Sequence, residues 1–151
     1  MPEEMDVTTL HRKFAVDCFN GTWSLLDKPD RTSDEDATMV HMAHASRYHW
    51  GQIGTPLEFA RGDWQISRVY ATLGLGETAL RYAKSSLDLC HANGYGDFDL
   101  AFAYEALARA CAVMGDLSRR DEYLLLANEA GHAIAEEEDR TYFFSELKTI
   151  P

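Results

Sequence analysis

Arginine side chains and an aromatic residue recur at helical spacing in the middle of the chain. Arg61, Gln65, Arg68 and Thr72 follow the spacing i, i+4, i+7 and i+11, and Trp64 lies beside them. Residues at this spacing share one face of a helix. Guanidinium groups next to an aromatic ring are suited to holding a carboxylate, a peptide end or an anionic small molecule. The alternative is a solvated helix face with weak i, i+4 pairs.

A second predicted helix carries Glu105 and Arg109 four residues apart, on a stripe equivalent to the first. The residues of the two stripes form one candidate ligand-binding groove, made of Arg61, Trp64, Gln65, Arg68, Glu105 and Arg109. No residue is predicted to be catalytic, because the sequence has no GxSxG elbow, phosphate-binding loop or GxGxxG segment. No cofactor is expected for the same reason.

Histidines offer an alternative chemistry. His41 and His44 are three residues apart on one predicted helix and could share a metal ion, although the pattern supplies no third ligand. Two acid-x-x-His segments, Asp88–His91 and Glu129–His132, have the spacing of ligands in di-iron helical bundles. Both fall near predicted helix C-termini, where the helix dipole alone favours a histidine. The alternative function is therefore a metal-dependent helical-bundle enzyme using His41 and His44.

Composition limits the classes of partner. The chain has 151 residues, of which 46% are hydrophobic and 11% aromatic, as expected of a single packed domain. Its 25 acidic and 14 basic residues give a net charge of −11. Such a charge disfavours binding to nucleic acid and to anionic membranes. We therefore expect neither partner.

Several features predict a cytoplasmic protein. Cys18, Cys90 and Cys111 are far apart and form no CxxC motif, which favours free thiols in a reducing compartment. The start, MPEEMDV, is acidic and lacks the apolar run of a secretory signal. The most apolar stretch, residues 100–115, is too short to span a bilayer.

Helix formers, caps and breakers predict an all-α fold. Thr32 and Glu35 fit a capping box, Ser118 and Asp121 resemble a second one, and Pro56 suits a first helical turn. About seven helices are expected, as three antiparallel pairs plus a C-terminal helix: 7–27, 32–50, 56–73, 77–93, 97–115, 118–134 and 136–147.

The sequence also matches itself after a shift of 41 residues. Arg68 then falls on Arg109, and Gly74 on Gly115, so that predicted helix boundaries coincide. The whole chain, 1–151, is predicted to be a single helical-repeat domain. It would contain a degenerate unit 7–53, units 56–94 and 97–134, and a C-terminal helix 136–148.

The unit resembles a tetratricopeptide repeat. Tyr70, Leu73, Gly74, Ala79 and Leu80 follow the order found at the centre of that repeat, and the resemblance covers residues 57–134. The period exceeds the roughly 34 residues of that family. The resemblance implies a right-handed solenoid in which the first helix of each pair lines a concave surface. The two arginine stripes would then face a groove.

The resemblance also implies a function. Tetratricopeptide-like domains mostly bind other proteins, so we expect a protein- or peptide-interaction module with no catalytic activity of its own. The arginines suggest a partner with an acidic group or a free carboxylate. A homodimer that covers a terminal unit is a further expectation.

Overall fold

The structure, a computed structural model, describes residues 6–151 and contains seven helices and no strand within that range. The helices are α1 (Val7–Leu26), α2 (Ser33–Ile53), α3 (Pro56–Thr72), α4 (Gly76–Asn93), α5 (Asp97–Met114), α6 (Leu117–His132) and α7 (Glu137–Leu147). The predicted all-α fold is confirmed. Residues 1–5, on which the expectation of no secretory signal partly rests, lie outside the described residues.

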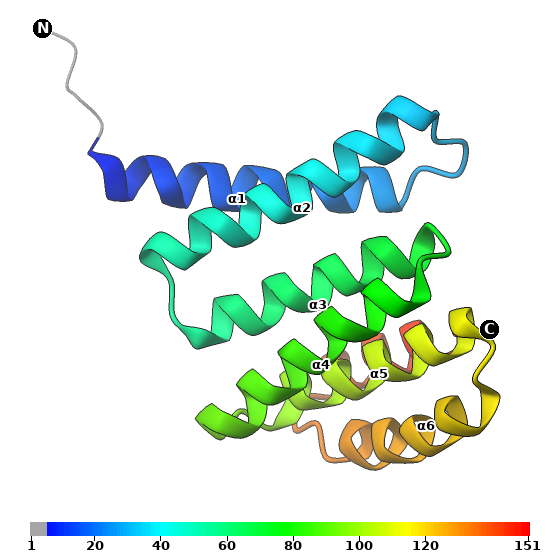
Figure 1. The fold of residues 1–151 in the computed structure, drawn as a ribbon. Helices are drawn as coiled ribbons and strands as arrows, with labels where there is room; N and C mark the ends of the chain where they lie inside the picture. Colours follow the sequence, from blue (N-terminus) through cyan, green and yellow to red (C-terminus); the bar gives the residue numbers. More distant parts are fainter. Residues whose placement is uncertain (1–5) are drawn as a thin grey trace, which may run out of the picture.

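The helices form three pairs that stack on one another (Figure 1). Helix α1 packs on α2, α3 on α4, and α5 on α6, while α2–α3 and α4–α5 contacts join successive pairs. The first helices of the pairs also touch, α1 with α3 and α3 with α5, and α7 packs against α5 and α6. Three helix pairs and a C-terminal helix are thus present as predicted. Helices α1, α3, α5 and α7 share one side of the stack.

Local sequence signals explain most helix ends. The capping box at the start of α2 is present, with the Glu35 backbone N–H donating to Thr32 Oγ1 at 3.1 Å. Gly74 and Gly115 have φ of 80° and 79°, the left-handed conformation that ends α3 and α5 at equivalent turns. The second predicted capping box is wrong, because α6 is capped earlier, by Asp116, whose carboxylate accepts from the Arg119 N–H at 3.2 Å.

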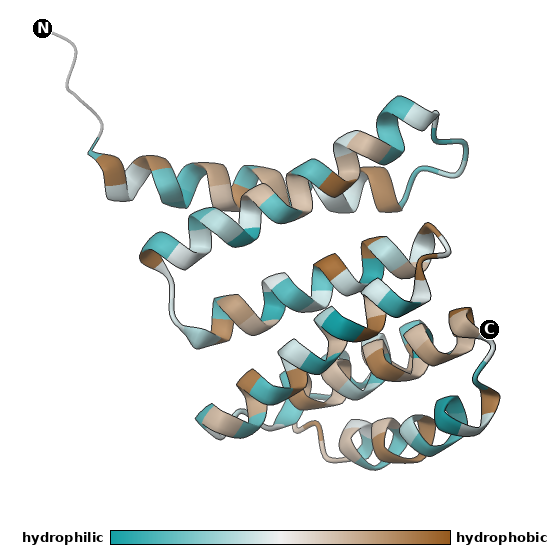
Figure 2. Cartoon of the chain, in the orientation of Figure 1, coloured by the Kyte–Doolittle hydropathy of each residue, from teal (hydrophilic) through white to brown (hydrophobic). Residues whose placement is uncertain are grey.

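Small residues let the two helices of each pair approach closely. Ser46 Oγ donates to the Ala15 carbonyl at 2.7 Å, and Ser86 Oγ donates to the Ala60 carbonyl at 2.9 Å. Ala101 and Ala127, both fully buried, share a core cluster in the third pair. Hydrophobic residues are interspersed with hydrophilic ones along the helices (Figure 2), as expected where each helix buries one side.

Within residues 6–151, the apolar stretches are too short or too interrupted by charge for any helix to cross a membrane.

Candidate functional site

Four residues spaced 41 positions apart in the sequence form a row across the side shared by α1, α3, α5 and α7. The row consists of Trp23, Trp64, Glu105 and Glu146, one from each helix. The ring centroids of Trp23 and Trp64 are 5.6 Å apart, and Trp64 Nε1 donates to Glu105 Oε2 at 3.2 Å. We call the side defined by these four residues the inner face. Glu146 continues the register, so α7 occupies the place of the first helix of a fourth unit.

A buried ion-pair network ties α3, α5 and α7 together on this face. Glu105 is fully buried and accepts from Arg109 Nε at 2.8 Å and from Arg68 Nη1 at 3.4 Å. Arg68 Nη2 also contacts Glu146 Oε2 at 2.7 Å. Arg109 Nη2 donates to the Glu146 carbonyl at 3.1 Å and to Thr149 Oγ1 at 2.7 Å. The two guanidinium groups are therefore held by the protein's own oxygens.

Three of the predicted groove residues, Arg68, Glu105 and Arg109, belong to this network. The Arg68 side chain is only 14% exposed, and Arg109 and Glu105 are buried. An external carboxylate would have to displace Glu105 or Glu146 to reach either arginine. The arrangement thus gives no support to the expected recognition of an acid by Arg68 and Arg109.

The other predicted groove residues lie nearer the α1 and α3 contact. Arg61 makes a two-pronged ion pair with Asp99, with Nε–Oδ1 at 2.8 Å and Nη2–Oδ2 at 3.2 Å, which raises the pKa of its guanidinium. Gln65 is buried and its Nε2 donates to the Phe19 carbonyl at 3.0 Å, tying α3 to α1. Within the described residues, Gln65 Oε1 has no hydrogen-bond partner. Trp64 lies at the centre of the inner face, between the rings of Trp23 and Phe102.

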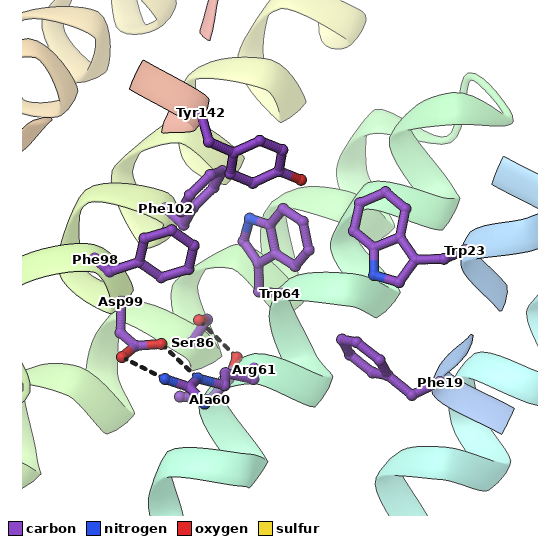
Figure 3. Close-up of a pocket in the computed structure, with 10 residues that line it drawn as sticks. All are labelled: Phe19, Trp23, Ala60, Arg61, Trp64, Ser86, Phe98, Asp99, Phe102 and Tyr142. Carbon is purple, nitrogen blue, oxygen red and sulfur yellow. Dashed lines mark hydrogen bonds and ion pairs between the residues drawn. The ribbon is translucent and has the colours of Figure 1, made fainter. Parts of the chain in front are cut away.

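The inner face contains a largely apolar pocket with a volume of about 180 Å³ (Figure 3). We call it the aromatic pocket; it is lined by Phe19, Trp23, Ala60, Arg61, Trp64, Ser86, Phe98, Asp99, Phe102 and Tyr142. The repeat explains the hollow. Phe19, Ala60, Ala101 and Tyr142 are spaced 41 residues apart, so small residues on the middle helices separate large residues on the outer ones.

Five of the six aromatic rings that line the pocket, all except Phe19, form one continuous group. Trp64 meets Phe102 edge to face with ring centroids 5.4 Å apart, and Phe102 lies 4.6 Å from Phe98 and 5.8 Å from Tyr142. Tyr142, which lines the pocket, is nevertheless 45% exposed to solvent. Burial raises the pKa of the Tyr142 phenol, and nearby carboxylates, Glu146 first among them, raise it further. Figure 3 shows the Arg61–Asp99 pair along one edge of the cavity.

Helical spacing in the sequence predicted two of the residues that line the pocket, Arg61 and Trp64, and none of the others. Phe19, Trp23, Phe98, Phe102 and Tyr142 belong to three helices, α1, α5 and α7, that are distant in the chain. The 41-residue shift held a usable signal. Extended to the first and last helices, it aligns Trp23 with Trp64 and places Tyr142 in register with the buried alanines.

The histidines singled out in the sequence do not converge. His41 is exposed, whereas the half-buried His44 lies with its Nε2 2.9 Å from the Tyr70 hydroxyl. Burial lowers the pKa of His44. His91 and His132 are exposed, and His132 packs on Phe144. Among residues 6–151, no three His, Cys, Asp or Glu side chains are grouped so that they could hold a metal ion.

The cysteines are free thiols. Cys90 and Cys111 are buried and Cys18 is partly buried. Burial raises the pKa of Cys90 to about 11 and raises that of Cys111 as well, so these two thiols are poor nucleophiles at neutral pH.

No family model matches the chain, and neither a curated protein nor a solved structure matches it significantly.

Proposed function

We propose that this chain is a protein- or peptide-interaction module of the tetratricopeptide-like type, with no catalytic activity of its own, and that the aromatic pocket holds a side chain of its partner. The observation that carries the proposal is the pocket itself, in which α1, α3, α5 and α7 bring aromatic rings around one open cavity. Concave sites lined by aromatic residues with a few polar groups at the edge are typical binding sites.

The size of the pocket favours a side chain over a free cofactor. Its volume of about 180 Å³ is well below the roughly 300–1,000 Å³ of pockets that hold drug-sized ligands. One large side chain of a bound peptide would fill it, and the peptide backbone would lie along the inner face. Such anchoring residues carry much of the affinity in protein interfaces.

The tetratricopeptide-like character of the proposal rests on the stacking of helix pairs and on the 41-residue register. A cytoplasmic location belongs to the proposal because three free thiols persist most readily in a reducing compartment. The homodimer expected from the sequence remains a prediction, to be tested by sedimentation of the full chain.

The test is a peptide selection followed by one matched pair of variants. Peptides from a random phage-displayed library, selected on the immobilised protein, are titrated against wild type, Tyr142→Ala and Tyr48→Ala. Both tyrosines are exposed, at 45% and 61%, but only Tyr142 lines the pocket. We expect Tyr142→Ala to weaken binding about tenfold, as for an interface residue that contributes to affinity without dominating it. Tyr48→Ala should change it less than twofold.

Two results would contradict the proposal. One is a selection that yields no binding peptide. The other is equal loss of affinity in both variants, which would place the binding surface away from the aromatic pocket.

A further inference from the structure

We propose that the partner is a basic peptide segment and that the side chain seated in the aromatic pocket is an arginine. This inference rests on the proposed function and specifies the chemistry of the partner.

The charges of the inner face leave an excess of carboxylate. Arg61 is paired with Asp99, and Arg68 and Arg109 are paired with Glu105 and Glu146. Each guanidinium on this face therefore already has a carboxylate partner. An acidic side chain arriving from outside would find no free cation and would have to compete with carboxylates held in place by the fold.

Asp27 supplies the excess. It caps α1 one turn after Trp23, which lines the pocket, and in the 41-residue register it occupies the place of Arg68 and Arg109. Among the described residues Asp27 takes part in no ion pair, and its side chain is exposed. Burial and Glu146 raise the pKa of Tyr142, which lines the pocket, and Arg68 lowers it; Asp27 adds a smaller upward shift, as expected of a carboxylate near that ring. One uncompensated negative charge thus stands beside the α1 end of the pocket.

The pocket walls suit a guanidinium group. Aromatic faces attract cations, and tryptophan and tyrosine attract them most strongly. Trp23, Trp64 and Tyr142 all contribute to the wall, and the rings of Phe98 and Phe102 extend it. Arginine combines a planar, weakly hydrated cation with an apolar stem, so it can enter such a cavity at a lower desolvation cost than lysine. The net charge of −11 would also speed the approach of a basic segment.

The test compares a cation with a neutral molecule of nearly the same shape. The probes are N-butylguanidinium and N-butylurea, titrated by NMR against the full chain. We expect the guanidinium to bind roughly 3- to 30-fold more tightly, the range that cation–π attraction spans. Peptides selected on the protein should likewise lose affinity when their arginine is replaced by citrulline, and higher salt should weaken the arginine form alone.

A pair of variants separates a local charge from the overall charge. Asp27→Asn and Asp34→Asn remove the same charge, but Asp34 lies in the first turn of α2 and lines no part of the pocket. Asp27→Asn should lower the preference for the guanidinium about twofold or more, as expected from loss of one nearby exposed charge. Asp34→Asn should leave it unchanged.

The outcomes distinguish this inference from the proposed function. Equal binding of guanidinium and urea, or equal effects of Asp27→Asn and Asp34→Asn, would overturn the arginine assignment and leave a neutral-anchor pocket standing. Binding by neither probe, together with selected peptides that ignore Tyr142→Ala, would overturn both.

Discussion

Removing the charge of Glu105 should destabilise the protein far more than removing that of an exposed carboxylate. Glu105→Gln keeps the shape of the side chain and one oxygen acceptor, but leaves Arg109 with neutral partners only, the Glu146 carbonyl and Thr149 Oγ1. Arg68 keeps its contact with Glu146 at 2.7 Å. Glu105→Gln therefore leaves the buried Arg109 guanidinium without a charged partner.

The magnitude follows from burial. Breaking a buried ion pair by removing one partner costs about 3–5 kcal/mol, and the retained amide oxygen places Glu105→Gln at the lower end, about 3 kcal/mol. A domain of this size loses about 2–4 °C of Tm per kcal/mol, so the melting temperature should fall by about 6–12 °C. The matched control is Asp17→Asn, because Asp17 and its partner Lys13, 2.7 Å apart, have side chains 57% and 53% exposed. An exposed pair contributes about 1 kcal/mol or less.

The assay is urea unfolding followed by circular dichroism, with free energies obtained by linear extrapolation. The double variant Glu105→Gln/Arg109→Met should recover part of the loss, because it removes the stranded cation. Equal losses for Glu105→Gln and Asp17→Asn would refute the reasoning, since they would show that the network between α3, α5 and α7 is solvated.

Two further changes probe the packing around α7 and the core between the first two pairs. Gly131→Ala should destabilise the protein by about 1–3 kcal/mol, because its added Cβ would lie 2.7 Å from Phe143 Cδ1 and push α7 away. In the control variant Gly51→Ala the added Cβ meets only the flexible end of Arg47, so stability should be unchanged or raised. Equal effects of the two variants in thermal melts would contradict this packing. Acidification should lower stability through His44, whose folded-state pKa is depressed chiefly by burial. As pH falls, His44 therefore binds a proton in the unfolded chain at a higher pH than in the folded protein. The free energy of unfolding that neutral His44 supports is fully present above pH 6.5 and is lost as pH falls below that value. His44→Gln should flatten this dependence in unfolding free energies measured between neutral pH and about pH 5. The contribution of His49, whose pKa burial also lowers, should persist. An unchanged slope would exclude His44 as the source.

Local signals in the sequence were sufficient to predict the helices. The capping box of Thr32 and Glu35 and the glycines at 74 and 115 act within a few residues of themselves, so their effect on the backbone can be inferred without the fold. The cap of α6 was predicted wrongly because two residues close together, Asp116 and Ser118, could each cap a helix, and the earlier one is used.

The inner face could be predicted only in part. Helical spacing correctly placed Arg61, Trp64 and Arg68 on adjoining positions of one helix, but it carries no information on what covers that helix. Glu146 and Tyr142 of α7 reach the same surface from about 80 residues away, as the Arg68–Glu146 pair shows with its separation of 78. Such long-range pairing is fixed by how the pairs stack, and the 41-residue register was the one sequence feature that recorded it.

The central claim is that a partner binds at the aromatic pocket, and the indole N–H signals of the three tryptophans test it most directly. Trp23 and Trp64 line the pocket, whereas Trp50, at the end of α2, does not. We predict that titration with a peptide selected on the protein shifts the Trp23 and Trp64 signals and leaves the Trp50 signal in place. Saturation of binding that moves Trp50 alone, or none of the three, would contradict the claim.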